Sequence, residues 1–192
     1  MIGLVSDRVY RYDLSTAWDL STATYQGNVS AVHGGDSAPR DIAFSSDGVH
    51  VFTVGTSSGN VFRHETYHGV AWGSPLIDII EESLFVDGDA DFPTGLALKP
   101  DGTKLYVSGS SNRMIVQYNL PVAWSLVGAT YEKSFDVNGN PSSQSPYDIE
   151  FSQDGIYMYV TGGLGEVVQY ELPNPWDIAG ANPLGTFDMG ST

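Results

Sequence analysis

No cysteine occurs among the 192 residues, so disulfide bonds and thiolate chemistry are excluded, and the cellular compartment is left open. Basic residues are also scarce, with 8 Lys and Arg against 23 Asp and Glu, and the formal net charge is −15. Such a negative field repels phosphate backbones, so we expect no nucleic-acid partner. No apolar run approaches the ~20 residues that a membrane-spanning helix needs, so we expect no membrane insertion.

What the sequence has in abundance is repetition. Asp-Gly pairs begin at Asp47, Asp101 and Asp154, at intervals of 54 and 53, and tryptophan recurs at positions 18, 72, 124 and 176. Each unit reads P-x-(D/G) followed by a short alternating run, the Asp-Gly pair, and further alternating runs. A period of about 50 residues built from short strands is typical of β-propeller blades.

One unit illustrates the expected blade. The runs TGLALK, TKLYVSG, MIVQYNL and GATYEKSFDV follow one another from position 94, and Asp101-Gly102 makes a hairpin turn between the first two. Alternation places Leu105 and Val107 on one face and Tyr106 on the other. We therefore predict four short antiparallel strands per blade, A to D from the channel outwards. Apolar strand-A residues at matching positions should pack between blades: Ile42, Phe44, Leu96, Leu98, Ile149 and Phe151.

The predicted fold class is all-β, a β-propeller of four-stranded antiparallel blades, with about three and a half blades in this chain. The expected divisions are a half blade over 1–37 and blades over 38–91, 92–144 and 145–192. Aligning Trp18 with Trp124 sets Met1 opposite Val107, so the chain begins near the end of a strand B. Three explanations stay open: a piece of a longer array, a protomer whose copies complete a ring, or a stable open arc.

Three phrases carry a family resemblance: YDLSTAWDLSTATY at 12–25, PTGLALKPDGTKLYVSGSSNRMIVQYNL at 93–120 and SPYDIEFSQDGIYMYVTGGLGEVVQYEL at 145–172. They resemble the NHL/YVTN-like β-propeller repeats of phage structural proteins and marine bacterial surface proteins. The resemblance covers almost the whole chain and implies a virion or cell-surface module for binding or assembly. It implies no catalytic residues. The blade over 38–91 departs most, because VFRHETYH replaces the IVQYNLP pattern.

Asp87, Asp89 and Asp91 form the strongest candidate for a metal site. Alternating carboxylates in a turn resemble the start of a calcium loop, although the full EF-hand pattern is absent. Glycine with aspartate is also what a tight turn requires, so an ordinary turn is the alternative.

Two other patterns have structural explanations. Residues 64–68 read HETYH and match the H-E-x-x-H zinc signature, but that motif works on a helix, and a strand separates the two histidines by about 13 Å. The repeated tryptophans could stack on sugar rings, yet their fixed place after each strand C favours packing within the blade.

Loops after strand B and the junctions from strand D to the next strand A should emerge on one face of the disc, where variable loops on a rigid scaffold carry binding. The residues that we expect on this binding face are Asp36, Asn112, Arg113 and Asn138.

No nucleophile, phosphate loop or cofactor motif is visible, so the sequence predicts a non-enzymatic module with no catalytic or cofactor-binding residues and no cofactor except possible calcium. We expect a protein or glycan surface as partner, with a homodimer or a larger propeller partner also possible, and a virion or extracellular location. The alternatives are a calcium-dependent sugar- or lactone-acting propeller enzyme, recognisable by acidic side chains converging on the axis, and a propeller lectin.

Overall fold

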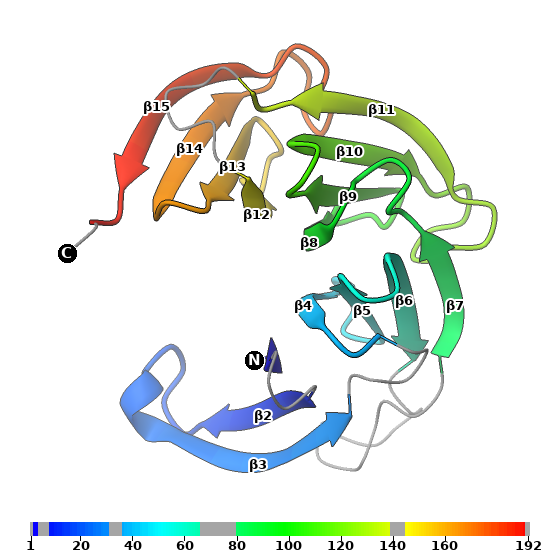
Figure 1. Ribbon diagram of the computed structural model, residues 1–192. Coiled ribbons are helices and arrows are strands. Elements are labelled where there is room, and N and C mark those ends of the chain that lie inside the picture. Colours follow the sequence, from blue (N-terminus) through cyan, green and yellow to red (C-terminus); the bar gives the residue numbers. More distant parts are fainter. Residues whose placement is uncertain (1, 4–7, 31–35, 66–79, 139–144, 191–192) are drawn as a thin grey trace.

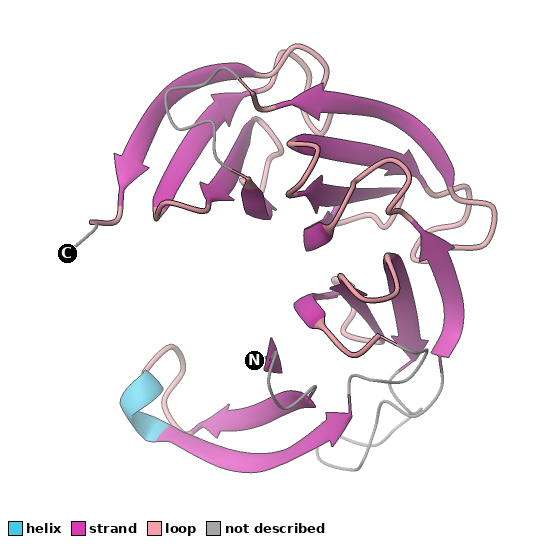
Figure 2. Cartoon of the chain, viewed as in Figure 1, coloured by secondary structure: helices cyan, strands magenta, loops and turns pink. Residues whose placement is uncertain are grey.

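The computed structural model describes residues 2–3, 8–30, 36–65, 80–138 and 145–190, and they form four antiparallel sheets around an arc (Figures 1 and 2). Within these residues three sheets have four strands and the first has three. The one short 3-10 helix described is η1, Leu20–Thr22. In the described part of the chain, no helix has the length and apolar character to cross a membrane.

The strands follow the chain in order. The first sheet contains β1 (Ile2–Gly3), β2 (Arg8–Leu14) and β3 (Ala23–Ser30). The second contains β4 (Pro39–Phe44), β5 (His50–Gly55), β6 (Asn60–Glu65) and β7 (Ile80–Phe85). The third contains β8 (Pro93–Leu98), β9 (Lys104–Gly109), β10 (Met114–Asn119) and β11 (Thr130–Asp136). The fourth contains β12 (Pro146–Phe151), β13 (Tyr157–Gly162), β14 (Glu166–Glu171) and β15 (Asn182–Asp188).

Each four-stranded sheet is one propeller blade. Strands β4, β8 and β12 lie nearest the axis, and β7, β11 and β15 form the outer rim (Figure 1). Consecutive strands pair as antiparallel neighbours, which short hairpin turns allow. The predicted fold class, an all-β partial propeller with strands A to D running outwards, is confirmed.

Neighbouring blades cover each other's apolar faces. Leu105 and Val107 of β9 pack in one core with Phe52 of the preceding blade, while Tyr106 packs in a second core with Phe151 of the following blade. The rings of Tyr106 and Phe151 are 4.4 Å apart between centroids. The predicted alternation of β9 is therefore correct, and it explains why this strand is buried on both faces.

Polar contacts also join the blades. The Tyr106 hydroxyl donates to the carbonyl oxygen of Trp176 at 2.6 Å, and the Lys133 ammonium pairs with Asp177 at 2.8 Å. Between the second and third blades, Glu82 accepts from the Ser125 hydroxyl at 3.0 Å, and Arg63 of its own blade pairs with Glu82 at 2.8 Å. Because a buried donor or acceptor is costly to leave unpaired, these contacts favour one alignment of adjacent sheets.

The repeated tryptophan covers the Asp-Gly turn of its own blade. The backbone N–H groups of Trp124 and Trp176 donate to the carbonyl oxygens of Gly102 and Gly155, both at 3.0 Å. A Cβ added to either glycine would come within 2.5 Å of the indole ring. Both glycines have φ near +74°, a region that side chains disfavour. The turn therefore requires glycine for two reasons: its positive φ and the indole ring that lies against it. The structure describes no part of Trp72.

The first sheet and the strand beside it depart from the repeat. Ile2 pairs with Val9 and Gly3 with Arg8, so β1 occupies the end of a strand B, as the alignment predicts. Phe44 of β4, which the repeat predicts to be packed between blades, is 46% exposed. Its counterpart Phe151 is buried, because the blade before it has a complete inner hairpin.

Replacing Gly155 by alanine should destabilise the fold, because the added Cβ collides with the Trp176 ring. Gly180 lies in the same blade at φ +71°, and its nearest neighbour would be Pro173 Cγ at 3.6 Å. Gly180→Ala therefore carries the backbone strain without the collision. We expect Gly155→Ala to lower the free energy of unfolding by about 1–3 kcal/mol more than Gly180→Ala does. Urea denaturation of both variants measures this, and equal losses would contradict the packing role of the tryptophan.

Candidate functional site

The inner strands present one equivalent position to the channel in each blade. Asp41 in β4, Gly95 in β8 and Asp148 in β12 all follow the first proline of their strand by two residues. In all three strands the pairing register shifts between that proline and this position, which marks a β-bulge. Bulges redirect side chains and are frequent beside active sites. The repeated proline and bulge thus direct the two carboxylates.

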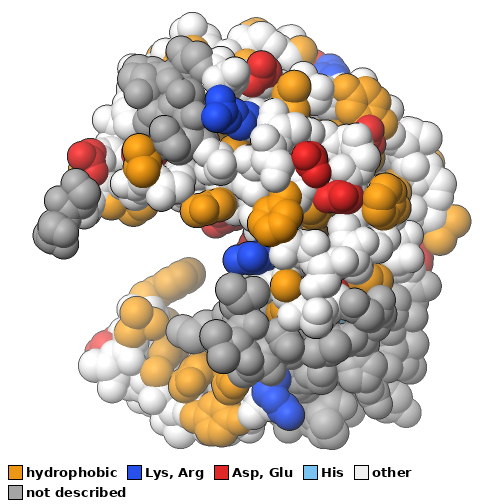
Figure 3. Space-filling view, in the orientation of Figure 1, with side chains coloured by type: hydrophobic (Ala, Val, Ile, Leu, Met, Phe, Trp, Pro, Cys, Tyr) orange, Lys and Arg blue, Asp and Glu red, His pale blue; other side chains and the backbone are white. Residues whose placement is uncertain are grey.

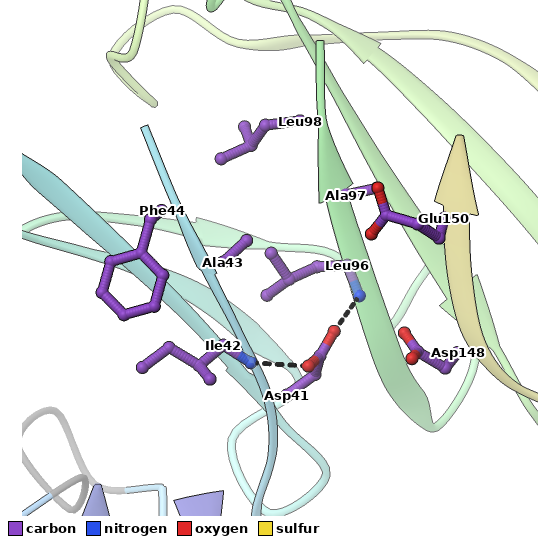
Figure 4. A pocket seen from close by; sticks show the side chains of 9 residues that line it. All are labelled: Asp41, Ile42, Ala43, Phe44, Leu96, Ala97, Leu98, Asp148 and Glu150. Atoms are coloured by element: carbon purple, nitrogen blue, oxygen red, sulfur yellow. Dashed lines mark hydrogen bonds between the residues drawn. The ribbon is translucent and has the colours of Figure 1, made fainter. Parts of the chain in front are cut away.

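Backbone amides hold both carboxylates in place. Asp41 accepts from the N–H of Ile42 at 2.7 Å and from the N–H of Leu96, on the next blade, at 2.8 Å (Figure 4). Asp148 accepts from the N–H of Ile149 at 2.8 Å. Each carboxylate bonds to the amide of the residue that follows it, so the two aspartates share one local geometry.

Glycine in the middle strand lets the two aspartates approach. A Cβ on Gly95 would lie 2.6 Å from the Cα of Asp148 and 2.8 Å from the carbonyl oxygen of Tyr147. No side chain fits into so close an approach of two backbones. The order aspartate, glycine, aspartate at this position of the three inner strands is therefore required by packing, because Gly95 leaves room for Asp148.

The surroundings raise the pKa of these carboxyl groups. Desolvation comes first and repulsion by Asp148 second, and together they raise the pKa of Asp41 to about 7. Desolvation also raises the pKa of Asp148 and that of Glu150, two residues further along β12. Two interacting carboxyl groups titrate as a unit. At pH 7 the carboxyl group of Asp41 is therefore close to half protonated.

This acid pair, Asp41 and Asp148, opens into a cavity of about 230 Å³. The walls come from β4, β8 and β12, and Figure 4 shows Glu150 on the same strand as Asp148, whereas Phe44 points to the opposite side of β4. Asp41 is half-buried and Asp148 is exposed to the channel. One neutral and one ionised carboxyl group at an accessible site can donate and accept a proton in the same reaction.

The predicted calcium loop lies elsewhere, between β7 and β8. The Asp87 carboxylate accepts from the N–H of Phe92 at 2.8 Å, and Asp89 accepts from the Tyr118 hydroxyl at 2.9 Å. Asp91 is exposed. Across the residues that the structure describes, no group of three or more His, Cys, Asp or Glu side chains could hold a metal ion. In this geometry the loop acts as a turn, and calcium binding there stays a prediction.

The predicted binding-face residues do lie where the loops after strand B meet the junctions after strand D. The buried Asp36 accepts from the Ser58 hydroxyl at 2.7 Å. Asn112 donates to the carbonyl oxygen of Asp89 at 2.8 Å, and Arg113 donates to Asn138 at 3.0 Å. These side chains therefore tie neighbouring loops to each other, and a ligand at this face stays a prediction.

The H-E-x-x-H pattern begins on a strand. His64 belongs to β6, is buried, and its Nε2 lies 3.0 Å from the Thr53 hydroxyl. Residues 66–68 fall outside the described residues. A strand placement of His64 agrees with the structural explanation of this motif.

Comparisons with known proteins show the fold. Neither the known protein-family models nor the curated proteins include a match to this chain. Among solved structures, a candidate 6-phosphogluconolactonase from Bacteroides fragilis is similar with a TM-score of 0.62 at 17% identity, over 96% of this chain and 50% of that one. A second, from Bacteroides uniformis, gives 0.59 at 15% identity, over 98% and 57%. The WD40 repeats of RRP9 give 0.52 at 11% identity, over 78% and 38%.

These likenesses define the chain as β-propeller in fold, and it spans about half the length of these two solved propellers. They give no support for the narrower NHL/YVTN type or for the phage resemblance. The expectation of a non-enzymatic module is corrected, because two of the similar structures are candidate 6-phosphogluconolactonases. The sequence was searched for nucleophile motifs, and Asp41 and Asp148 were not singled out, although the repeated P-x-(D/G) pattern marked their position.

Replacing Asp148 by asparagine should stabilise the protein at alkaline pH. A carboxyl group whose pKa is higher in the folded than in the unfolded protein stabilises the fold fully at pH values below its unfolded pKa. This stabilisation is lost as the pH rises through its folded pKa. For Asp41 that window runs from about 4 to about 7. In Asp148→Asn the amide keeps an oxygen for the Ile149 N–H and can donate to Asp41. We expect the melting temperature to rise at pH 8 more than at pH 5.

The matched control is Asp154→Asn. Hydrogen bonds from Ser152 and from the N–H of Ile156 lower the pKa of Asp154, so the ionised form is the favoured one in the fold. Its replacement should lower the melting temperature at pH 8. If Asp148→Asn behaves like Asp154→Asn at pH 8, the two inner carboxyl groups do not repel each other.

Proposed function

We propose that the acid pair catalyses the hydrolysis of a cyclic ester of a sugar acid, a lactone. One observation carries the proposal: Asp41 and Asp148 converge on the axis from different blades, and the pKa of each carboxyl group is raised, that of Asp41 to about 7. Acidic side chains that converge on the axis are what we expect of an enzyme in this fold. The candidate 6-phosphogluconolactonases of the same fold make a lactone a reasonable substrate class.

The chemistry of lactone opening matches a pair that holds one proton. The ionised carboxylate accepts a proton from water as the water oxygen bonds to the ester carbonyl carbon. The tetrahedral intermediate then breaks its bond to the ring oxygen, and the neutral carboxyl group donates its proton to that oxygen. The product is an open-chain hydroxy acid, and the pair again holds one proton. Proton transfer by positioned groups contributes about 10²–10⁴-fold in rate.

Local structure supports each role. Amides of Ile42 and Leu96 bond to both oxygens of Asp41 and fix the position of its carboxyl group. Asp148 keeps one oxygen on the Ile149 amide and is exposed to the channel, where water can reach it. The cavity of about 230 Å³ is lined by three carboxyl groups, those of Asp41, Asp148 and Glu150, which can hydrogen-bond the hydroxyl groups of a sugar acid.

The direct test is hydrolysis of gluconolactone by the purified chain, corrected for spontaneous opening. We expect Asp148→Asn to lower kcat by about 10²-fold, although the same change stabilises the fold. Asp154 lies on an exposed turn away from the channel. Asp154→Asn is therefore the control, and its kcat should be unchanged. A rate equal to spontaneous opening, or full activity in Asp148→Asn, would contradict the proposal.

The pH profile supplies a second readout. Because the neutral carboxyl group is the acid, kcat should fall as pH rises through about 7, the pKa to which Asp41 is raised. Asp41→Asn should remove this limb of the profile.

Partners and location stay predictions: a protein or glycan surface, on a virion or outside the cell, and calcium as a possible ligand.

A further inference from the structure

Arg40 differs from most basic residues of this acidic chain. The sequence has only 8 Lys and Arg against 23 Asp and Glu. Most of these basic side chains form an ion pair with a carboxylate, namely Arg11, Arg63, Lys99, Lys104 and Lys133. In the part of the chain that the structure describes, no carboxylate pairs with Arg40. Among the side chains that Figure 3 colours, the basic ones are few and lie apart from one another.

The bulge of β4 places Arg40 at the mouth of the channel, the end at which the inner strands begin. Pro39 pairs with Gly55 and Asp41 pairs with Val54, so Arg40 is the extra residue of the bulge. The next residue, Asp41, lines the cavity of the acid pair. Arg40 therefore lies one residue along the chain from that cavity, in a half-buried position.

Two contacts hold the guanidinium group of Arg40. Its Nε donates to the Thr56 hydroxyl at 3.3 Å, and its Cζ lies 5.7 Å from the centroid of the Phe92 ring, on the next blade. A guanidinium group stacks well on an aromatic face and carries five N–H donors in one plane. For the donors on its two Nη atoms, the described residues provide no acceptor. These donors can therefore bind two oxygens of one oxyanion.

The aromatic ring against Arg40 belongs to a strained residue. The φ of Phe92 is 56°, in the left-handed region that bulky residues rarely adopt. Ala38 and Ser145, which precede the proline in the other two blades, do not have a positive φ. The Asp87 carboxylate accepts from the Phe92 N–H at 2.8 Å, and the Phe92 carbonyl oxygen accepts from the N–H and the hydroxyl of Ser110, at 3.1 and 3.0 Å. Strain that is held in this way is frequent at ligand-binding sites.

We propose that Arg40 and Phe92 form an anion site at the mouth of the channel, and that the site binds a small ligand through an oxyanion, a carboxylate or a phosphate group. The two Nη atoms of Arg40 donate to the oxyanion, while Thr56 and the Phe92 ring hold the guanidinium plane. Because the net charge of −15 repels anions from the surface as a whole, binding requires such local donors. This inference goes beyond the proposed function, since it concerns residues outside the acid pair and requires no hydrolysis.

Nuclear magnetic resonance of the 192-residue chain locates the binding. The probes are inorganic phosphate and gluconate, each titrated at an ionic strength that sodium chloride keeps constant. The Nε–H signal of Arg40, identified by its absence in Arg40→Gln, should shift and saturate with at least one of the two anions. The Nε–H signals of the other arginines should stay in place, and uncharged glucose should leave the Arg40 signal unchanged. Comparison of the two affinities distinguishes a phosphate from a carboxylate ligand.

Three variants test the geometry, with the backbone amide signal of Thr56 as the reporter. Arg40→Gln should weaken binding by at least about tenfold, because hydrogen bonds to a charged group are lost. Arg40→Lys keeps the charge but loses the planar donors, so it should also weaken binding. Phe92→Leu removes the aromatic face and should weaken binding by at least about twofold. The matched control is Arg113→Gln, which changes the net charge equally and should bind normally, because Arg113 donates to Asn138.

Three results would overturn the anion site. They are an equal loss of binding in Arg40→Gln and Arg113→Gln, a shift that chloride alone reproduces, and the absence of a saturable shift with both anions. The same spectra show whether each variant is folded. The outcome is also separate from the proposed hydrolysis: a chain that binds gluconate through Arg40 but does not open gluconolactone would keep the anion site and contradict the proposed function.

Discussion

Adjacent sheets of this protein cover each other's apolar faces, and the third sheet, with a neighbour on each side, is covered on both. This constraint explains most of what the structure shows. Strand β9 carries Leu105 and Val107 toward one neighbour and Tyr106 toward the other, so its sheet is buried on both sides. Burying a large side chain contributes about 1.5–3 kcal/mol, and polar contacts such as Tyr106 to Trp176 fix how adjacent sheets align.

The same constraint places the acid pair. Sheets that stack around an axis bring their inner strands close together, and Gly95 is required because the backbone of Asp148 lies against it. Asp41 and Asp148 therefore meet although 107 positions separate their numbers in the chain. Desolvation raises the pKa of both carboxyl groups, and repulsion by Asp148 raises that of Asp41 further. The chemistry proposed for the site is thus a consequence of blade packing.

Sequence analysis predicted the fold in detail because the repeat is local. The period of the Asp-Gly pairs, the alternation in KLYVSG and the aligned tryptophans each report on one blade, and the structure confirms the strand order. The meeting of Asp41 and Asp148 at the channel was not predicted. It depends on the angle between blades and on the bulge after Pro39 and Pro146, which the sequence does not report. The exposure of Phe44 was also missed, because the repeat places it at the same strand position as the buried Phe151.

Because the stability of this protein comes from covered sheet faces, the sheet covered on both sides should be its most stable part. Amide hydrogen exchange of the intact chain, followed strand by strand, measures this. Strands β8, β9 and β10 should exchange slowest, in step with global unfolding, and β2 and β3 should exchange fastest among the strands. Protection of β2 and β3 equal to that of β9 would show that covered faces do not set the stability.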